Sequence, residues 1–155
     1  RVPLILSVPG QTLPGGKTNA LVEFVDVYPT LADLCGLPAP NGVEGISLRP
    51  LLAEPERAWK RAVFSQYPRA RSGNRHRKHG DIMGYAVRTD RYRYVEWQEW
   101  KTKRIIAREL YDHRHDVNEA RNVAAMSEYK NDISRLSQLL RKGWREVLPE
   151  VPERM

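Results

Sequence analysis

The opening residues, RVPLILSV, show almost no alternation of apolar and polar positions. A strand that is covered on both faces of a mainly parallel sheet has this pattern, because both rows of its side chains are buried. We therefore predict an interior strand over residues 2–8. Such a strand needs neighbours on either side, and we expect these neighbours to belong to sequence outside the 155 residues.

A loop rich in proline and glycine follows, and then a short apolar helix that begins near Asp26. We expect the Asp26 side chain to cap this helix, and Pro29 fits the first turn because its missing N–H would be unpaired there. Gly36 stands where a left-handed residue would end the helix, and Pro38 prevents its continuation. The spacing places one apolar face on Val27, Leu31 and Leu34.

Residues 41–61 are predicted to form a surface connection, after which the pattern changes to strands. Four segments are rich in valine, tyrosine and isoleucine, and the turn at residues 89–91 favours a hairpin between the middle two. The predicted strands span residues 62–68, 82–89, 92–97 and 107–112.

The chain closes with a predicted helix over residues 127–147, whose apolar positions recur at steps of three and four. The stripe consists of Tyr129, Ile133, Leu136, Leu140, Trp144 and Val147. A helix with one apolar face beside four antiparallel strands makes a two-layer α+β unit. The predicted fold class is therefore α/β, with a terminal strand and helix in residues 1–60 and an α+β subdomain in residues 61–155.

Composition and charge narrow the class of protein. The chain is 41% hydrophobic and 29% charged, and it has no apolar run of the ~20 residues that a membrane-spanning helix needs. Its formal net charge is +7, which favours anionic partners such as nucleic acid, sulfated sugars or acidic protein surfaces. The same excess could be a local one that another part of a larger protein balances. The single Cys35, in an apolar helical context, is expected to be a buried small residue rather than a nucleophile.

Several ordered segments together resemble the C-terminal part of a type I sulfatase, in the iduronate-2-sulfatase-like branch of the alkaline-phosphatase-like superfamily. The segments are RVPLILSVPG, VEFVDVYPTLADLCGLPAPNGVEGISLRPLL, VFSQYPR, MGYAVRTDRYRYVEW and ELYDHRHDVNEARNVA. The combination of SQYPR with MGYAVRT and YRY points to the iduronate-type branch.

The resemblance implies that residues 1–60 are the incomplete C-terminal end of a catalytic domain and that residues 61–155 are the C-terminal subdomain. The family's formylglycine nucleophile lies in a C/S-x-P/A-x-R motif, which the sequence around Cys35 does not match. The resemblance thus implies a sulfuric ester hydrolase, acting on a sulfated sugar such as a sulfated uronate, whose catalytic groups lie upstream. We expect this chain to be inactive alone, and to pair with a missing N-terminal sulfatase domain or with itself.

The resemblance also implies calcium or another divalent cation for the complete enzyme, with no cofactor held by this chain. The densest group of acidic and histidine residues is DHRHD, residues 112–116. This stretch could form a metal site, or a capping arrangement in which Asp116 and Glu119 bind free backbone N–H groups. The capping arrangement is favoured because the Arg114 charge opposes a cation. The family includes exported enzymes, but the sequence leaves the compartment open.

Three residues of SQYPR are the candidate substrate-binding residues. Arg69 offers a planar charged group for a carboxylate or sulfate, Gln66 can bond to sugar hydroxyls, and Tyr67 can stack or bond. The alternative is that Tyr67 packs in the sheet and that Arg69 is a solvated strand end.

Two basic regions suggest an alternative function, a non-enzymatic module that binds polyanions such as nucleic acid or a sulfated glycan. The loop over residues 69–79 carries the strongest basic run of the chain, and it could equally be solvated without a ligand. Arginines and tyrosines also interleave around the hairpin at residues 85–94, as on surfaces that stack nucleic-acid bases. Alternation along two paired strands gives the same pattern, so the hairpin interpretation is favoured and nucleic acid is not.

Overall fold

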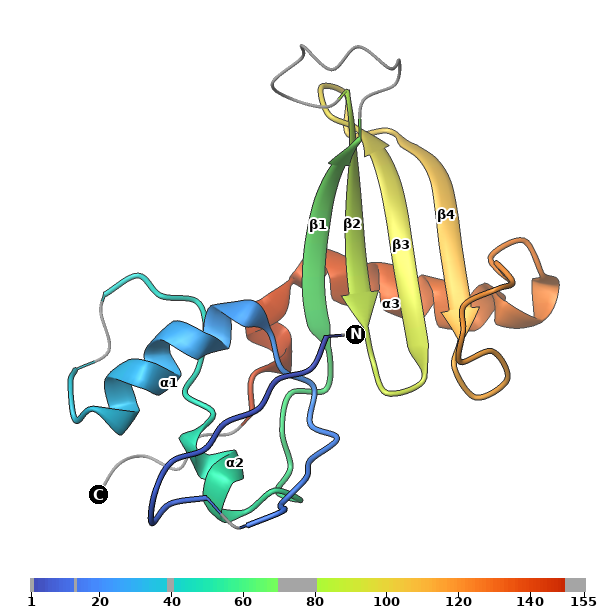
Figure 1. The fold of residues 1–155 in the computed structure, drawn as a ribbon. Helices are drawn as coiled ribbons and strands as arrows, with labels where there is room; N and C mark the ends of the chain where they lie inside the picture. The colour runs from blue at the N-terminus through green and yellow to red at the C-terminus, as the bar shows by residue number, and fades with distance from the viewer. Residues whose placement is uncertain (1, 13, 39–40, 70–80, 150–155) are drawn as a thin grey trace. The chain divides into compact units, whose positions relative to one another are not determined.

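The computed structural model describes residues 2–12, 14–38, 41–69 and 81–149. They divide into two compact units, residues 1–60 and residues 61–155. In Figure 1 the first unit runs from blue to green along the colour bar, and the second from green to red. No helix among the described residues combines the length and the apolar character needed to cross a bilayer.

The second unit is built on a four-stranded antiparallel sheet in the order β1-β2-β3-β4 (Figure 1). This confirms all four predicted strands to within a few residues. Their bounds are β1 Val63–Arg69, β2 Ile82–Arg88, β3 Tyr92–Glu99 and β4 Ile105–Asp112. The tight turn between β2 and β3 is closed by the Tyr92 carbonyl, which accepts from the Thr89 N–H at 2.8 Å. Sequential neighbours pair throughout, as expected for short connections.

The C-terminal helix α3, Lys130–Lys142, packs on one face of this sheet (Figure 1). It is shorter than predicted: a 3-10 turn at Ser127–Tyr129 precedes it, and another at Trp144–Val147 follows. The break falls at Gly143, whose φ of 81° lies in the left-handed region that ends helices. The predicted apolar stripe nevertheless faces the sheet. The core consists of Ala62, Val87, Tyr92, Tyr94, Leu110, Val123, Leu136 and Val147.

A buried carboxylate joins α3 to the sheet. Glu96 on β3 is 1% exposed, and its Oε1 accepts from the Tyr94 hydroxyl at 2.9 Å and from the Ser137 hydroxyl at 2.6 Å. Its Oε2 accepts from the Gln98 amide at 3.1 Å. Burial and this neighbouring carboxylate raise the pKa of Tyr94 to about 12. The core therefore contains one polar cluster with its hydrogen bonds satisfied, as burial of a charge requires.

The first unit contains two short helices, α1 Val27–Leu34 and α2 Arg49–Ala53, with a 3-10 turn at Phe24–Asp26 before α1. Gly36 has a φ of 69° directly after α1, so the predicted left-handed terminator is confirmed. Helix α2 was not predicted within the surface connection. Its first turn accepts a proline, as expected where the backbone N–H has no helical partner, and Leu51 anchors it by burial.

The strand predicted over residues 2–8 is wrong for the described chain. These residues form no strand, and the side chains of Val2 and Ile5 are 83% and 87% exposed. A strand forms when its backbone N–H and C=O groups pair with a neighbour, and no described residue offers such a neighbour to this segment. Residues 2–8 are therefore apolar but are not buried by the described part of this chain.

The predicted apolar face of α1 is only partly buried. Leu31 is half exposed, whereas Pro29, Thr30 and Ala32 are the buried positions. Cys35 at the end of the helix is exposed rather than buried. Much of the buried side of the helix is set by a polar cluster rather than by leucine side chains.

That polar cluster centres on Asp26, which is fully buried and does not cap α1 through its side chain. Its carboxylate accepts from the Glu23 N–H and the Ile46 N–H, both at 2.9 Å, and from Lys60 Nζ at 2.8 Å. Lys60 is also buried and lies 2.8 Å from the Glu23 carboxylate. Thr30 completes the link, because its hydroxyl accepts from the Leu48 N–H at 2.8 Å. We call Glu23, Asp26 and Lys60 the buried charge cluster.

Candidate functional site

The predicted substrate-binding residues lie on the edge strand β1. Successive side chains of a strand point to opposite faces of the sheet. Tyr67 and Arg69 therefore share one face, and Gln66 lies on the other, the face that α3 covers. We call the face opposite α3 the outer face. The structure thus brings Tyr67 and Arg69 together and separates Gln66 from them, while the substrate role of the three stays a prediction.

On the outer face the indole ring of Trp97 lies beside Arg69. Strand β2 lies between the strands that carry them, and its Gly84 is directly opposite Trp97 in the β2–β3 register. The Arg69 guanidinium carbon lies 5.5 Å from the centre of the Trp97 ring, within the range of a cation–π contact. Tyr67, on the same face, is 67% exposed. These side chains form an aromatic and basic surface at the β1 end of the sheet.

The outer face continues toward β4 as a connected polar network. Glu109 accepts from Trp97 Nε1 at 2.8 Å and from the Tyr111 hydroxyl at 3.1 Å. Burial and the Glu109 charge raise the pKa of Tyr111. The Arg93 guanidinium lies over the Tyr111 ring, 4.7 Å from its centre. The network therefore links the middle of β3 to the exposed side of β4.

Beyond β4 the network ends on Glu119 and His113. Arg93 Nη2 lies 2.5 Å from Glu119 Oε2, His113 Nε2 lies 2.6 Å from Glu119 Oε1, and the Arg88 guanidinium contacts His113 Nδ1. Burial opposes ionisation of Glu119, but the bonds from Arg93 and His113 prevail and hold its pKa below the usual value. Glu119 has a φ of 56°, which a glutamate rarely adopts. These contacts hold it in that conformation.

The position of Glu119 corrects part of the predicted capping arrangement. Asp116 does bind backbone groups, since its carboxylate accepts from the Ala120 N–H at 3.0 Å and the Arg121 N–H at 2.8 Å. These bonds lower the pKa of Asp116. Glu119 does not return to cap the same turn, because its left-handed backbone directs its carboxylate to Arg93 instead.

Asp112 on β4 forms a bidentate salt bridge with Arg91. Arg91 Nε donates to its Oδ1 at 2.9 Å and Arg91 Nη2 donates to its Oδ2 at 2.6 Å, and Tyr129 and the Arg114 N–H add further contacts. The bond from Arg91 lowers the pKa of Asp112 from its ordinary 3.8 to about 2, although burial acts in the opposite direction. This pair ties the β2–β3 turn to the end of β4.

We expect the Arg91→Met variant to lose stability relative to the parent protein at neutral pH but much less at pH 2. Because the pKa of Asp112 is depressed, its stabilisation is complete above pH 3.8 and is lost as the pH falls through about 2. Since Arg91 is partly exposed, the difference at neutral pH should be about 1–2 kcal/mol. Urea unfolding of both proteins from pH 7 to pH 2 measures it. A difference that stays constant over this range would contradict the assignment.

The described residues do not fit a divalent cation or a sulfatase nucleophile. No group of three or more histidine, cysteine, aspartate or glutamate side chains among them is placed to hold a metal ion. The carboxylates of DHRHD are bound to arginine and to backbone N–H groups. Cys35 lies outside the sulfatase motif.

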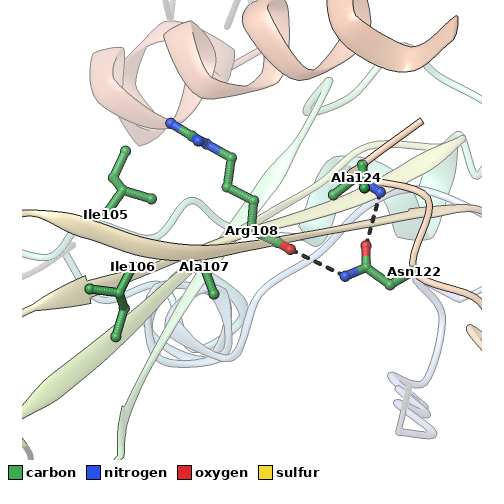
Figure 2. Close-up of a pocket in the computed structure, with 7 residues that line it drawn as sticks. Ile105, Ile106, Ala107, Arg108, Asn122 and Ala124 are labelled. Carbon is green, nitrogen blue, oxygen red and sulfur yellow. Dashed lines mark hydrogen bonds between the residues drawn. The ribbon is translucent and has the colours of Figure 1, made fainter. Parts of the chain in front are cut away.

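Two clefts in the described part of the second unit are most clearly formed, and neither is lined by Tyr67 or Arg69. Figure 2 shows the first, of about 310 Å³, along β4; its only charged lining residue is Arg108. Asn122 closes one side of it by donating to the Arg108 carbonyl at 3.2 Å and accepting from the Ala124 N–H at 3.0 Å (Figure 2). Apolar side chains form most of its lining. It offers no acid and base pair.

The second cleft, of about 340 Å³, lies near the β2–β3 turn and is richer in charge. Two of its arginines are already paired, Arg91 with Asp112 and Arg135 with Asp132. Burial and the hydrogen bond to Asp132 raise the pKa of Tyr92 to about 12. The third arginine, Arg61, donates to the Glu146 carbonyl at 2.8 Å, so all three arginines of this cleft have partners.

Two of the tyrosines that suggested nucleic-acid binding are buried. Tyr92 and Tyr94 are 2% and 0% exposed on the face that α3 covers, so their rings cannot stack on bases. Most of the predicted basic loop, residues 70–79, lies outside the described residues.

Sequence reasoning missed Trp97 and Glu109. Both lie within predicted strands, and the signal that could have found them is the hairpin register. Counting outward from the turn at residues 89–91 pairs Trp97 with Gly84, and the β1–β2 register, which the folded sheet supplies, pairs Gly84 with Tyr67. Side chains paired directly opposite one another share a face. This places Trp97 on the same face as Arg69.

Comparison with known proteins gives a consistent result. Residues 1–146 match the family described as N-sulphoglucosamine sulphohydrolase, C-terminal. The N-acetylglucosamine-6-O-sulfatase of Bacteroides thetaiotaomicron is 27% identical over 163 aligned positions, which cover 99% of this chain and 26% of that protein.

Two solved structures extend the comparison. A protein in complex with its substrate D-glucosamine-2-N,6-O-disulfate has a TM-score of 0.70 at 25% identity, covering 86% of this chain and 26% of that one. A 2-O GAG sulfatase has a TM-score of 0.57 at 29% identity, with 76% and 23% covered. The chain therefore spans about a quarter of the length of these relatives.

Proposed function

The chain belongs to the C-terminal family of N-sulphoglucosamine sulphohydrolases, and from this premise we propose that it completes the fold and the substrate pocket of a sulfatase that hydrolyses a sulfate ester of a sugar. The observation that carries the proposal is the match over residues 1–146. The outer face supports it, because the Arg69 guanidinium has no carboxylate partner among the described residues and lies beside Trp97, with the exposed Tyr67 on the same face. Such a surface is suited to an anionic group carried on a sugar ring.

The sulfated sugar is the finer part of the proposal. Likeness to a glucosamine-6-sulfatase and to a protein bound to a disulfated glucosamine supports an amino sugar. Likeness at 29% identity to a 2-O GAG sulfatase supports a sulfated uronate, the substrate class of the iduronate-type branch. Both substrates carry a sulfate, and a uronate adds a carboxylate. A guanidinium binds either group through two parallel hydrogen bonds.

Within this chain, Arg69 is the proposed anchor of the substrate's anionic group, and Tyr67 provides an exposed ring that can stack on the sugar. Among the described residues no carboxylate pairs with Arg69, so its charge is available to a ligand. Gln66 would act only if the sugar reached past the edge strand β1 to its other face. These residues bind and orient, and they leave the bond cleavage to other groups.

We propose that the nucleophile and the divalent cation, calcium or another, are supplied by a part of the enzyme outside this chain. The absence of a fitting motif and of a fitting group of ligands among the described residues supports this division. The cation would supply Lewis-acid stabilisation of the sulfate oxygens when bound. The isolated chain would then lack turnover.

The surface of the first unit supports a partner domain. Large apolar side chains are exposed along α1 and the turn before it, with Phe24 at 90% and Tyr28 at 59%. Phe24, Tyr28 and Leu31 follow one another at helical spacing, so they lie on one side. Monomeric proteins rarely leave such a stripe uncovered. We propose that an N-terminal sulfatase domain covers it, and that the isolated chain self-associates in its absence.

The substrate role is tested by NMR titration of the chain with D-glucosamine 6-sulfate, using unsulfated D-glucosamine as the control ligand. We expect shifts concentrated at Tyr67 and Arg69. Arg69→Ala should weaken binding at least about tenfold, since a charge-assisted hydrogen bond contributes about 1.5–3 kcal/mol. Arg141→Ala, which removes the same charge from the exposed side of α3, should leave binding unchanged. Equal losses in both variants would mean that the sugar responds only to net charge, and the proposed site would be wrong.

A further inference from the structure

We propose that Trp97 is a positioning residue: its indole ring, fixed between Gly84 and Glu109, holds the Arg69 guanidinium in one orientation over the outer face, ready for the anionic group of a sulfated sugar. The inference rests on the proposed function for the identity of the ligand. The arrangement of the side chains stands independently of it.

The first step is the seat of the ring. A Cβ atom at Gly84 would lie 2.7 Å from Cζ3 of Trp97 and 3.0 Å from its Cε3. A Cβ atom essentially never lies 2.7 Å from a non-bonded atom of another residue. The indole therefore fills the space that a side chain at position 84 would take. Gly84 and Trp97 are directly paired on neighbouring strands. The missing side chain therefore lets the ring lie flat on the backbone of β2.

The second step is the anchor of the ring's far edge. Trp97 Nε1 donates to Glu109 Oε1 at 2.8 Å, and Glu109 Oε2 accepts from the Tyr111 hydroxyl at 3.1 Å. Because Glu109 is held from both oxygens, it does not turn freely with the indole. A ring that is seated on one strand and bonded to another has little rotational freedom. It forms a fixed surface on the outer face.

The third step is the guanidinium itself. Arg69 lies at the exposed end of β1, with its guanidinium carbon 5.5 Å from the centre of the Trp97 ring. No carboxylate among the described residues pairs with it. An arginine side chain loses considerable rotamer freedom when it binds a ligand, and a stacked arginine has already lost part of it. The Trp97 ring therefore improves binding by Arg69 without contacting the ligand.

The test compares Trp97→Leu with the matched control Trp100→Leu in the full 155-residue chain. Trp100 is exposed and carries Lys103 3.9 Å from its ring centre, so the control removes another tryptophan–cation pair without touching Arg69. The readout is the NMR resonance of the Arg69 Nε–Hε group. The indole ring current changes its chemical shift, and restricted motion of the side chain sharpens it. We expect Trp97→Leu, and not Trp100→Leu, to remove this shift. An Arg69 resonance unchanged by Trp97→Leu would overturn the inference.

A second variant keeps the inference testable if Trp97→Leu fails to fold. Glu109→Ala leaves the ring in place but removes its anchor, and we expect a partial loss of the Arg69 shift with thermal unfolding close to that of the parent chain. Trp97→Tyr, which restores a ring, should recover part of the shift lost in Trp97→Leu. A full Arg69 shift in folded Glu109→Ala would show that the anchor plays no part.

A ligand titration separates this inference from the proposed function. Using D-glucosamine 6-sulfate, we expect Trp97→Leu to weaken binding about two- to fivefold, the size of one cation–π contact, and Trp100→Leu to leave it unchanged. If the parent chain binds no sulfated glucosamine, the proposed substrate role fails, while the Arg69 resonance still decides the positioning role. If binding is identical in the parent chain and Trp97→Leu, the positioning role fails while the substrate role survives.

Discussion

Replacement of Asp26 by alanine should destabilise the first unit by about 3–5 kcal/mol, because it leaves the Lys60 ammonium buried without its main partner. The substitution also removes the acceptor of two backbone N–H groups, those of Glu23 and Ile46. Hydrogen exchange at the Leu48 N–H provides a local reading, since this group bonds to Thr30 rather than to Asp26. Its protection should fall by more than a hundredfold, which corresponds to about 3 kcal/mol.

The matched control for this experiment is Glu54→Ala. Glu54 is an exposed carboxylate of the same unit, and removing it should change stability by less than about 0.5 kcal/mol. Asp26→Asn should fall between the two, because an amide oxygen still accepts while the charge is lost. If Asp26→Ala exchanges like Glu54→Ala, the buried charge cluster does not hold the unit together.

Removal of the buried carboxylate of Glu96 should have a comparable effect on the second unit. Glu96→Ala deprives the Tyr94 hydroxyl and the Ser137 hydroxyl of their shared acceptor, in a site where neither can reach water. An unsatisfied buried polar group costs about 1–3 kcal/mol, and the substitution also leaves a cavity. We expect a loss of about 3 kcal/mol, measured as the free energy of urea unfolding followed by near-UV circular dichroism.

Two further variants define the origin of that loss. Glu96→Gln retains an acceptor and should lose less than Glu96→Ala, whereas Glu128→Ala removes an exposed carboxylate before α3 and should lose less than about 1 kcal/mol. The pKa of Tyr94 should also fall in Glu96→Ala, because the neighbouring charge is one of the causes that raise it to about 12. An unchanged free energy of unfolding in Glu96→Ala would show that α3 docks through its apolar stripe alone.

The sheet could be predicted from the sequence because its signals are local. Alternation within each strand and the tight turn at residues 89–91 set four strands and their antiparallel order. The end of α3 was also visible, since Gly143 directly follows Lys142 and such glycines commonly end helices. The apolar stripe that continues to Val147 concealed it. In fact the chain resumes as a 3-10 turn that still buries Val147.

The first unit could not be predicted in the same way, because its buried side depends on distant residues. Asp26 meets Lys60, 34 positions later, and only the folded chain shows that a charged pair rather than leucine side chains occupies the interior. Hydrophobic periodicity assumes that the apolar side of a helix is its buried side. In α1 that assumption holds only in part, because Leu31 is exposed while Val27 and Leu34 are partly buried.

Only part of the candidate site could be predicted from the sequence. The period of two along a strand already separates Gln66 from its neighbours Tyr67 and Arg69, whichever way the sheet is covered. The contact of Arg69 with Trp97 is different in kind. It requires the register of three strands and the absence of a side chain at Gly84, so it becomes apparent only once the strands are paired.

The most direct test of the account is a sulfate-release assay on the purified 155-residue chain. Inorganic sulfate would be quantified after incubation with D-glucosamine 6-sulfate and with a 2-O-sulfated uronate, with and without added calcium. The account assigns binding and orienting side chains to this chain and the hydrolytic groups to another part of the enzyme, so it predicts no sulfate above the level of a protein-free blank under any condition. Release that grows in proportion to the amount of folded chain would contradict it, since the hydrolytic groups would then lie within these residues.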